Sequence, residues 1–217
     1  MKKRSKIQLV VDTLAFPLRA FTLFHYDKWG FSSLSSERYD YAARYVIGRC
    51  LDVGCGRHNR FVEEYLGGNG VGIDVYEYEG LSDEHVVSDL SEFPFDDGEF
   101  DTVTFLANIN HIPKSMRDRE LSEAWRCLSS KGNVIVTMGN PLAEVVVHKV
   151  VWFYDKLFGT NNDMDSERGM DEEEEYYLND REIVSRLRKA GFGNIQKKYF
   201  FTQWGLNHLF VGWKSGE

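Results

Sequence analysis

The stretch that decides the fold is "LDVGCGRHN", which runs from Leu51 to Asn59. An apolar run that carries one acid ends here at two glycines that flank Cys55. Gly54 and Gly56 lack a Cβ atom, so the turn can adopt dihedral angles closed to other residues, and a ligand can lie against its backbone. We interpret the stretch as a buried strand followed by a ligand-binding loop.

Around this stretch, short β-rich runs alternate with helical patterns, which predicts an α/β fold whose mostly parallel sheet carries helices on both faces. A crossover helix is expected over 114–128, and "SSKG" (129–132) is expected to close it as a turn. Asn179 is typical of the cap of a further helix, and Gly191 of its end. The runs expected to form strands are 49–53, 70–74, 84–88, 100–107, 133–139, 194–202 and 208–214.

Composition excludes several classes of protein. In 217 residues, Lys and Arg number 26 and Asp and Glu 34, and the resulting net charge of −8 argues against a sequence-independent grip on nucleic acid phosphates. The three cysteines, Cys50, Cys55 and Cys127, are odd in number and lack CxxC spacing, so neither a disulfide framework nor a zinc site is indicated. No metal is expected, and a reducing, cytoplasmic compartment fits best.

The N-terminus begins like a signal peptide, because Lys2, Lys3 and Arg4 precede the apolar "IQLVVDTLAF". Asp12 interrupts that run, and no small-residue cleavage site follows it cleanly. No uninterrupted apolar stretch reaches the roughly 18 residues of a membrane span, so we expect no stable membrane insertion.

Acidic residues follow the strands that come after the glycine loop. A dinucleotide-binding loop would read GxGxxG, and the third glycine is missing here. Asp74 ends the second expected strand about twenty residues downstream, where an acid accepts hydrogen bonds from ribose hydroxyls. Asp89 follows the third, where a carboxylate can accept from the exocyclic amine of a base. With Asp52, three acids converge on one edge of the sheet, which indicates a nucleotide-like ligand.

These residues lie in motifs that resemble, in order, those of the class I S-adenosylmethionine-dependent methyltransferases. "LDVGCG" is similar to the family's first motif, "VGIDV" (71–75) to its ribose-binding strand end, and 88–112 to its adenine segment and fourth strand. "SEAWRCLSSKGNVIVTMGNP" (122–141) resembles the following helix and fifth strand, with "LSSKG" in place of the family's "LKPGG". The likeness extends from about Cys50 to Lys214.

The resemblance implies a Rossmann-like, doubly wound sheet of seven strands with one antiparallel strand, and S-adenosylmethionine as cofactor. It implies one methyltransferase domain made of a helical cap (1–48), a cofactor-binding core (49–140), an inserted helix with an acidic loop (141–178) and a C-terminal helix and hairpin (179–217). The cofactor-binding residues that it implies are Asp52, Gly54, Cys55, Gly56, Asp74, Val75, Asp89, Leu90 and Ala107. Arg57 departs from the family's pattern and would crowd the pocket or bind the cofactor carboxylate.

Several other residues have two interpretations. His111, just past the fourth strand, is either the general base that deprotonates the acceptor or a histidine that packs or caps there. Tyr26 and Trp29 either form a lid over the cofactor or a small N-terminal core. "DEEEE" (171–175) is more typical of a solvated surface run than of a cation site. Cys55 is interpreted as inert because no base lies at suitable spacing.

The function predicted from these observations is methyl transfer to a small molecule, with an apolar part that docks on the inserted segment. The side chains expected to contact that part are Val146, Val150, Phe153 and Phe158. One alternative is a module that binds S-adenosylmethionine and acts in assembly or regulation without transferring methyl groups. A second, an NAD-dependent oxidoreductase, is disfavoured by the missing third glycine.

Overall fold

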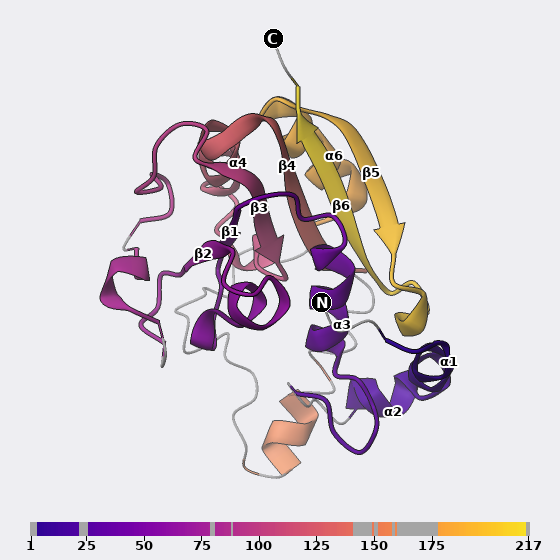
Figure 1. The fold of residues 1–217 in the computed structure, drawn as a ribbon. Helices are drawn as coiled ribbons and strands as arrows, with labels where there is room; N and C mark the ends of the chain where they lie inside the picture. Colours follow the sequence, from indigo (N-terminus) through magenta and orange to yellow (C-terminus); the bar gives the residue numbers. More distant parts are fainter. Residues whose placement is uncertain are drawn as a thin grey trace.

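The computed structural model describes residues 4–21, 26–78, 81–87, 89–140, 149, 152–157, 159 and 178–215 (Figure 1). Its described strands form one sheet in the order β2-β1-β3-β4-β6-β5. The strands β1 to β4 run parallel to one another, and β6 is antiparallel to both of its neighbours. Their bounds are Cys50–Val53 (β1), Gly70–Ile73 (β2), Phe100–Leu106 (β3), Leu128–Gly139 (β4), Phe192–Tyr199 (β5) and Asn207–Lys214 (β6).

The expected seventh strand, over 84–88, is the main difference. Of the described residues of this run, Val86 alone forms a bridge, an isolated parallel one to Asp74, in which the Asp74 N–H donates to His85 O at 3.1 Å and the Val87 N–H to Asp74 O at 2.9 Å. Asp83–His85 form a 3-10 turn in which the His85 N–H donates to Ser82 O at 2.9 Å, so this N–H is taken by the turn and the pairing extends no further back along the chain. The described sheet therefore has six strands, and the prediction of seven was wrong.

Two further boundaries differ from the prediction. "SSKG" is not a turn, because β4 begins at Leu128 opposite Phe100, before the register shifts along β3. Gly132 allows this close pairing, since a Cβ there would lie 3.0 Å from Asp101 O. The strand expected over 194–202 ends at Tyr199, because Phe201–Gln203 form the 3-10 turn η5. The remaining expected strands and the crossover helix are confirmed within a few residues.

Helices cover both faces of the sheet, as predicted (Figure 1). Leu121 and Ala124 of α4, with Ile183 and Leu187 of α6, pack into the core on one face. Ala42 of α3 and Phe61, from the helical turn Phe61–Tyr65, pack on the other. The described helices are Lys6–Leu14 (α1), Phe16–Phe21 (α2), Leu34–Ala43 (α3), Arg117–Cys127 (α4) and Asp180–Lys189 (α6).

Side-chain caps begin three of these helices. Ser5 Oγ accepts from Gln8 N–H at 3.1 Å, and Ser33 Oγ accepts from Ser36 N–H at 3.1 Å. Asn179, predicted as a cap, accepts from Glu182 N–H at 3.0 Å. Each bond satisfies an N–H that the first helical turn leaves without an intrahelical partner.

A buried ionic network joins the N-terminal helices to the rest of the chain. Arg19 of α2 is almost fully buried and pairs with the buried Glu37 of α3. Gln203 of η5 donates to the same carboxylate at 2.8 Å. Arg4 pairs with Asp12 of α1 at 3.1 Å and also with Asp40 of α3. Because so many charged groups are satisfied together, α1 and α2 hold a defined position against α3.

This network predicts a strong coupling between Arg19 and Glu37. Arg19→Met leaves the Glu37 carboxylate buried beside a neutral side chain and should lower the free energy of unfolding by about 3 kcal/mol, whereas Arg19→Met with Glu37→Leu should recover most of that loss. Urea denaturation of the single and double variants measures the coupling. Additive losses would contradict the pairing.

Candidate active site

Gly54 begins the loop after β1 and lies against the loop that follows β3. Its φ is 73°, in the left-handed region that favours glycine. A Cβ at Gly54 would overlap the side-chain amide of Asn108, whose Nδ2 donates to Val53 O at 3.1 Å. The two loops therefore pack directly together at the edge where β1 and β3 end.

Gly56, the second glycine, differs in that its missing Cβ faces open space. Its φ is 67°, and a Cβ there would meet nothing within 4 Å. The Gly56 N–H donates to Asp74 Oδ2 at 2.9 Å, and the Tyr76 N–H donates to Asp74 Oδ1 at 3.1 Å. Asp74, 6% exposed, thus ties the glycine loop to the end of β2. A carboxylate can accept several hydrogen bonds at once, which suits a group that also meets ligand hydroxyls.

Asp52 lies beneath this loop on β1 and is buried. Thr104, its register partner on β3, donates its hydroxyl to Asp52 Oδ1 at 2.6 Å. Burial raises the pKa of Asp52 to about 7, with the nearby Asp74 charge adding to the rise and the Thr104 hydrogen bond opposing it. This site favours either a proton on Asp52 or a cation beside it.

The loop after β3 is held in an uncommon conformation. Ala107 has φ 55°, rare for a residue with a side chain, and its N–H donates to Thr137 Oγ1 of β4 at 2.9 Å. Arg117, buried at the start of α4, donates from Nε to Ile112 O at 2.8 Å and from Nη2 to Asn110 O at 3.2 Å. His111 lies between these two anchored carbonyls, half-buried, at the same edge as the glycine loop.

The segment expected to border the adenine has one exposed and one buried residue. Asp89 is exposed, and its Oδ1 accepts from Ser91 N–H at 2.7 Å, which lowers the pKa of Asp89. Leu90 is buried in the core. Val75 is 43% exposed beside Asp74, an apolar side chain available to a ligand.

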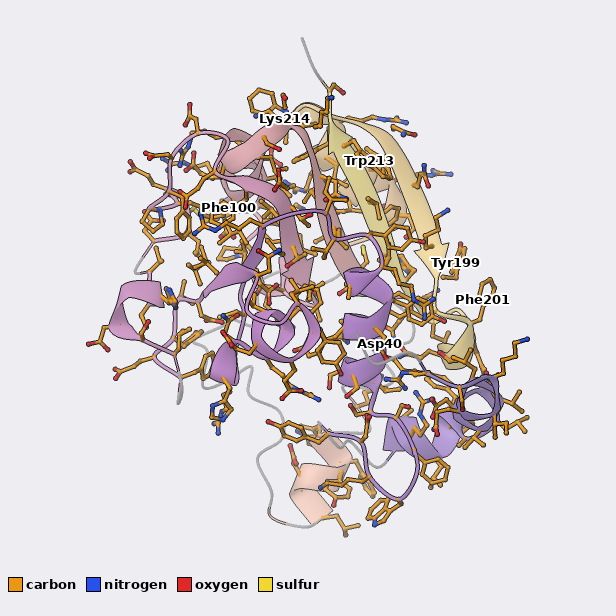
Figure 2. The ribbon with its side chains drawn as sticks, viewed as in Figure 1. Asp40, Phe100, Tyr199, Phe201, Trp213 and Lys214 are labelled. Carbon is orange, nitrogen blue, oxygen red and sulfur yellow. The ribbon has the colours of Figure 1, made fainter. Side chains whose placement is uncertain are left out.

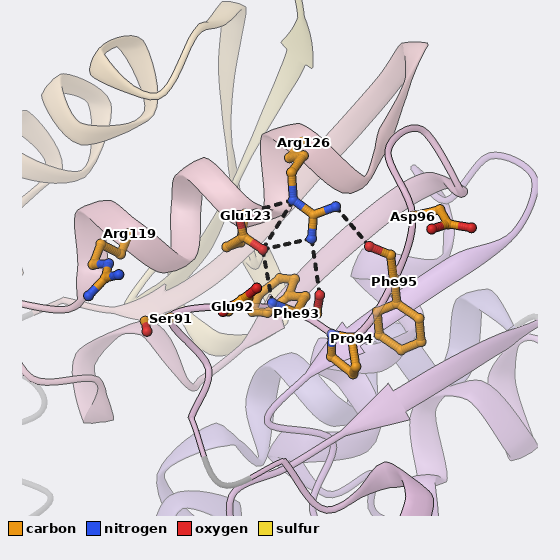
Figure 3. Close-up of a pocket in the computed structure, with 9 residues that line it drawn as sticks. All are labelled: Ser91, Glu92, Phe93, Pro94, Phe95, Asp96, Arg119, Glu123 and Arg126. Carbon is orange, nitrogen blue, oxygen red and sulfur yellow. Dashed lines mark hydrogen bonds and ion pairs between the residues drawn. The ribbon is translucent and has the colours of Figure 1, made fainter.

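A pocket of about 570 Å³ lies behind this segment (Figure 3). Arg126 of α4 donates there to Phe95 O at 2.8 Å and Phe93 O at 3.0 Å, and pairs with Glu123 at 2.7 Å. Glu123 also accepts from Phe93 N–H at 2.9 Å. These charged groups are already paired, so the pair holds the 93–95 backbone in place rather than offering a ligand site.

Residues outside the glycine loop complete the site, and sequence patterns alone did not single them out. Asn108, Thr104 and Arg117 act through contacts between segments distant in the chain. Glu120 of α4 is buried, and burial together with the Asp89 charge raises its pKa to about 8. The polar "NIN" that follows β3 (108–110) was the one local signal for Asn108.

Other expected residues have different surroundings. Arg57 is exposed and leaves the space beside Gly56 open, so crowding of the pocket is not observed. Cys55 is buried, and burial raises the pKa of its thiol, which fits the inert role predicted. Tyr26 lies under the Arg60 guanidinium, 4.4 Å from the ring centroid, and Trp29 is 75% exposed.

Of the expected acceptor surface, Val146, Val150 and Phe158 lie outside the described residues, as does the acidic run 171–175 that was interpreted as a solvated surface run. Phe153 is described, in a helical segment over 152–157, and is 62% exposed. Trp152 and Leu157 of the same segment are also exposed.

Known proteins with the same motifs and architecture define the family. Residues 51–136, which contain the glycine loop, Asp74 and the loop after β3, match the family described as "Methyltransferase domain". Over these residues the chain carries a methyltransferase domain with the motifs of the class I S-adenosylmethionine-dependent methyltransferases. Its family and the cofactor of that family, S-adenosylmethionine, are as predicted from the sequence.

Two curated relatives of this methyltransferase chain carry the same name. The chain is 28% identical over 141 residues to the ubiquinone/menaquinone biosynthesis C-methyltransferase of Paracoccus denitrificans. The alignment covers 59% of this chain and 52% of that protein. The chain is 29% identical over 138 residues to the enzyme of that name from Cereibacter sphaeroides, with the same two coverages. The chain spans about half the length of the curated relatives it matches.

Solved structures show the same fold at low sequence identity. A possible histamine N-methyltransferase of Thermotoga maritima has a TM-score of 0.55 and 17% identity, with 93% of each chain covered. The 1,6-didemethyltoxoflavin-N1-methyltransferase of Burkholderia thailandensis, solved with its substrate and S-adenosylhomocysteine, has a TM-score of 0.55 and 13% identity, with 99% of this chain and 92% of that chain covered.

The residues of this methyltransferase site fit its cofactor in three respects. The missing Cβ of Gly56 leaves room against the backbone. The Asp74 carboxylate lies directly beside Gly56, at the end of β2. Asp52 supplies a buried carboxylate near a loop that would receive a cationic sulfonium and ammonium.

The two glycines should respond differently to substitution. Gly54→Ala combines a positive φ with overlap on Asn108 and should lower the free energy of unfolding by about 2–4 kcal/mol. Gly56→Ala meets no neighbour and adds only the strain of a backbone (φ 67°, ψ −163°) that is nearly restricted to glycine, about 1–3 kcal/mol. Chemical denaturation measures both. Gly54→Ala combined with Asn108→Gly should regain part of the loss; if it does not, the overlap is not the cause.

The raised pKa of Asp52 predicts a pH-dependent stability. Because the folded state holds this proton more tightly than the unfolded chain, whose Asp pKa is about 3.9, stability falls as pH rises from about 4 through the folded pKa of about 7. Asp52→Asn keeps an acceptor for Thr104 and removes the titration. Relative to the native chain, the variant should gain stability as pH rises from about 4 to about 7, measured as the difference in Tm between the two proteins across that range. A difference that is flat with pH would contradict the shift.

Proposed function

We propose that this chain transfers a methyl group from S-adenosylmethionine to a small, partly apolar acceptor. The observation that carries the proposal is the arrangement of Gly56 and Asp74: a loop with an open backbone position, held by a carboxylate at the end of β2. Contacts within the protein fix the conformation of this loop: Asn108 contacts it from the β3 side and Asp74 from the β2 side.

The chemistry requires little beyond positioning. The bound cofactor supplies a methyl group on a sulfonium, whose departure as a neutral thioether needs no assistance. The acceptor atom forms the new bond to carbon as the carbon–sulfur bond breaks, and it must lose its proton if it is to end neutral. His111 is our candidate for accepting that proton, because Arg117 and Asn108 anchor the loop that carries it at the cofactor edge.

The buried acid Asp52 supports cofactor binding electrostatically. Burial destabilises the charged form of Asp52, which is why its pKa is raised. A neighbouring cation would stabilise that charged form, because its charge replaces the solvation that burial removed. We infer that a cationic cofactor binds with release of the Asp52 proton at pH values below about 7. Asp74 would accept the ribose hydroxyls, and Val75 would contact the base.

The acceptor is proposed to be partly apolar on two grounds. Trp152, Phe153 and Leu157 expose large apolar side chains on the helical segment that follows β4. Isolated surface aromatics are common, but three in six residues indicate a surface that contacts an apolar ligand. The curated relatives are named for the biosynthesis of ubiquinone and menaquinone, compounds of aromatic and apolar character.

A pair of glycines with similar φ angles tests the proposal. Gly56→Val places a branched side chain where the cofactor would lie, so calorimetric binding of S-adenosylhomocysteine should be lost, together with label transfer from S-adenosylmethionine to a pool of small aromatic and quinone-like acceptors. Gly67→Val is the control: its φ is 64°, its Cβ would also meet nothing within 4 Å, and it lies at the far end of the helical turn Phe61–Tyr65.

Two results would go against the proposal. If Gly67→Val loses binding as completely as Gly56→Val, backbone strain and not occupancy of the site is responsible. If the native chain binds S-adenosylhomocysteine but transfers no label to any acceptor class, the chain is a binding module and not an enzyme.

A further inference from the structure

The helix α1 buries a charged residue and exposes apolar ones, the opposite of what is usual for a helix on a protein surface. Its acid, Asp12, is fully buried, whereas Ile7 is 78%, Val10 59% and Leu14 77% exposed. These three apolar residues recur at helical spacing and lie on one face. A surface helix ordinarily turns its apolar face to the core and its charges to water, so the outward face of α1 is built to be covered by something else.

This orientation is held by polar contacts on the inner face of the helix. Asp12 accepts from Ser32 N–H at 3.0 Å and from the Ser32 hydroxyl at 2.6 Å, and pairs with Arg4 at 3.1 Å. Gln8 donates to Gly30 O at 2.9 Å. Rotating α1 to bury Ile7 and Leu14 would break this set of bonds, so the exposed face is part of the fold.

The turn η5 extends the apolar face of α1. Trp204 Nε1 donates to Thr13 O at 2.8 Å, which places η5 beside α1. Phe201 is 77% and Trp204 58% exposed, and Figure 2 shows Phe201 pointing away from the protein. Leu18 of α2 is also half-exposed. We call Ile7, Val10, Leu14, Leu18, Phe201 and Trp204 the N-terminal apolar patch.

The charge around the patch identifies its occupant. Residues 1–21 carry five basic residues and one acid in a chain whose net charge is −8; Arg4 and Arg19 are paired in the buried network, and the other three are Lys2, Lys3 and Lys6. The acid, Asp12, is buried in the network, and Lys6 is exposed directly before Ile7. Lys2 and Lys3 precede it in sequence, and residues 200–206 carry no charge. Apolar and aromatic side chains beside an exposed lysine, in a segment whose sequence begins with two more, match an anionic bilayer surface, where apolar groups enter the acyl boundary and ammonium groups contact phosphates.

We propose that the N-terminal apolar patch docks this protein peripherally on membranes that contain anionic phospholipids. None of the described helices combines the length and apolar composition needed to cross a bilayer, so the contact is with one leaflet. The inference stands on the exposed face of α1 and η5 and is independent of the methyl acceptor.

The place of the patch in the fold has a functional consequence. Gly139, the last residue of β4, pairs with Asn207, the first residue of β6, so η5 lies at the edge where the parallel strands end. The glycine loop and the loop after β3 are at that same edge. Docking would therefore bring the edge that carries the candidate active site towards the lipid, where an apolar acceptor partitions.

Vesicle flotation of the full chain tests the proposal. We expect flotation with vesicles of phosphatidylcholine and phosphatidylglycerol, much weaker flotation with phosphatidylcholine alone, and loss of binding as salt rises from about 0.1 M to about 0.5 M. Val10→Gln with Leu14→Gln should lower the vesicle partition coefficient about tenfold or more, and Lys6→Glu should lower it for anionic vesicles only.

The matched control is Ile47→Gln, which removes an apolar side chain 43% exposed in the loop before β1. It should float like the native chain, and all variants should keep native thermal melting and S-adenosylhomocysteine binding. Flotation unchanged by the Val10 and Leu14 substitutions would overturn the proposal. So would absence of flotation combined with a concentration-dependent dimer that these substitutions dissociate, because the occupant would then be a second copy of the chain.

Discussion

The carboxylate of Asp74 is the constraint on which the candidate site depends. It ends β2 and accepts backbone N–H groups from two places, Gly56 in the loop after β1 and Tyr76 in its own following turn. A glycine-rich loop has the largest conformational entropy to lose on ordering. Two hydrogen bonds to a charged, nearly buried acceptor offset that loss and present the loop to a ligand in one conformation.

The loop after β3 completes the arrangement from the opposite side. Asn108 occupies the space that Gly54 leaves, so the two loops can exist in their present form only together. The backbone of Ala107, in the same loop, is strained by its positive φ. The hydrogen bonds from Ala107 N–H to Thr137 and from Arg117 to Ile112 O offset that strain. His111, the proposed general base, would be positioned by the packing of this loop, and fixed positioning is what a displacement reaction needs.

The N-terminal helices show the same principle at a different scale. Burying Arg19, Glu37, Asp12 and much of Arg4 is unfavourable for each charge alone and is compensated by their mutual pairing. The network commits the polar side of α1 to the interior, and the apolar side is left outside. One set of buried charges thereby determines both where the helical cap lies and which surface it offers to a partner.

The sequence by itself determined the order of strands and helices from Cys50 onward, the glycine loop, Asp74 at the end of β2, and the family, because these are local patterns and fixed spacings. It misjudged the strand expected over 84–88, where the turn Asp83–His85 takes the residues that pairing would need. Only the tertiary structure decided that Thr104 faces Asp52, that Asn108 fills the space at Gly54, and that α1 turns its apolar face outward. These contacts join residues far apart in the chain, and neither spacing nor periodicity records which side chains strand pairing and buried charges bring together.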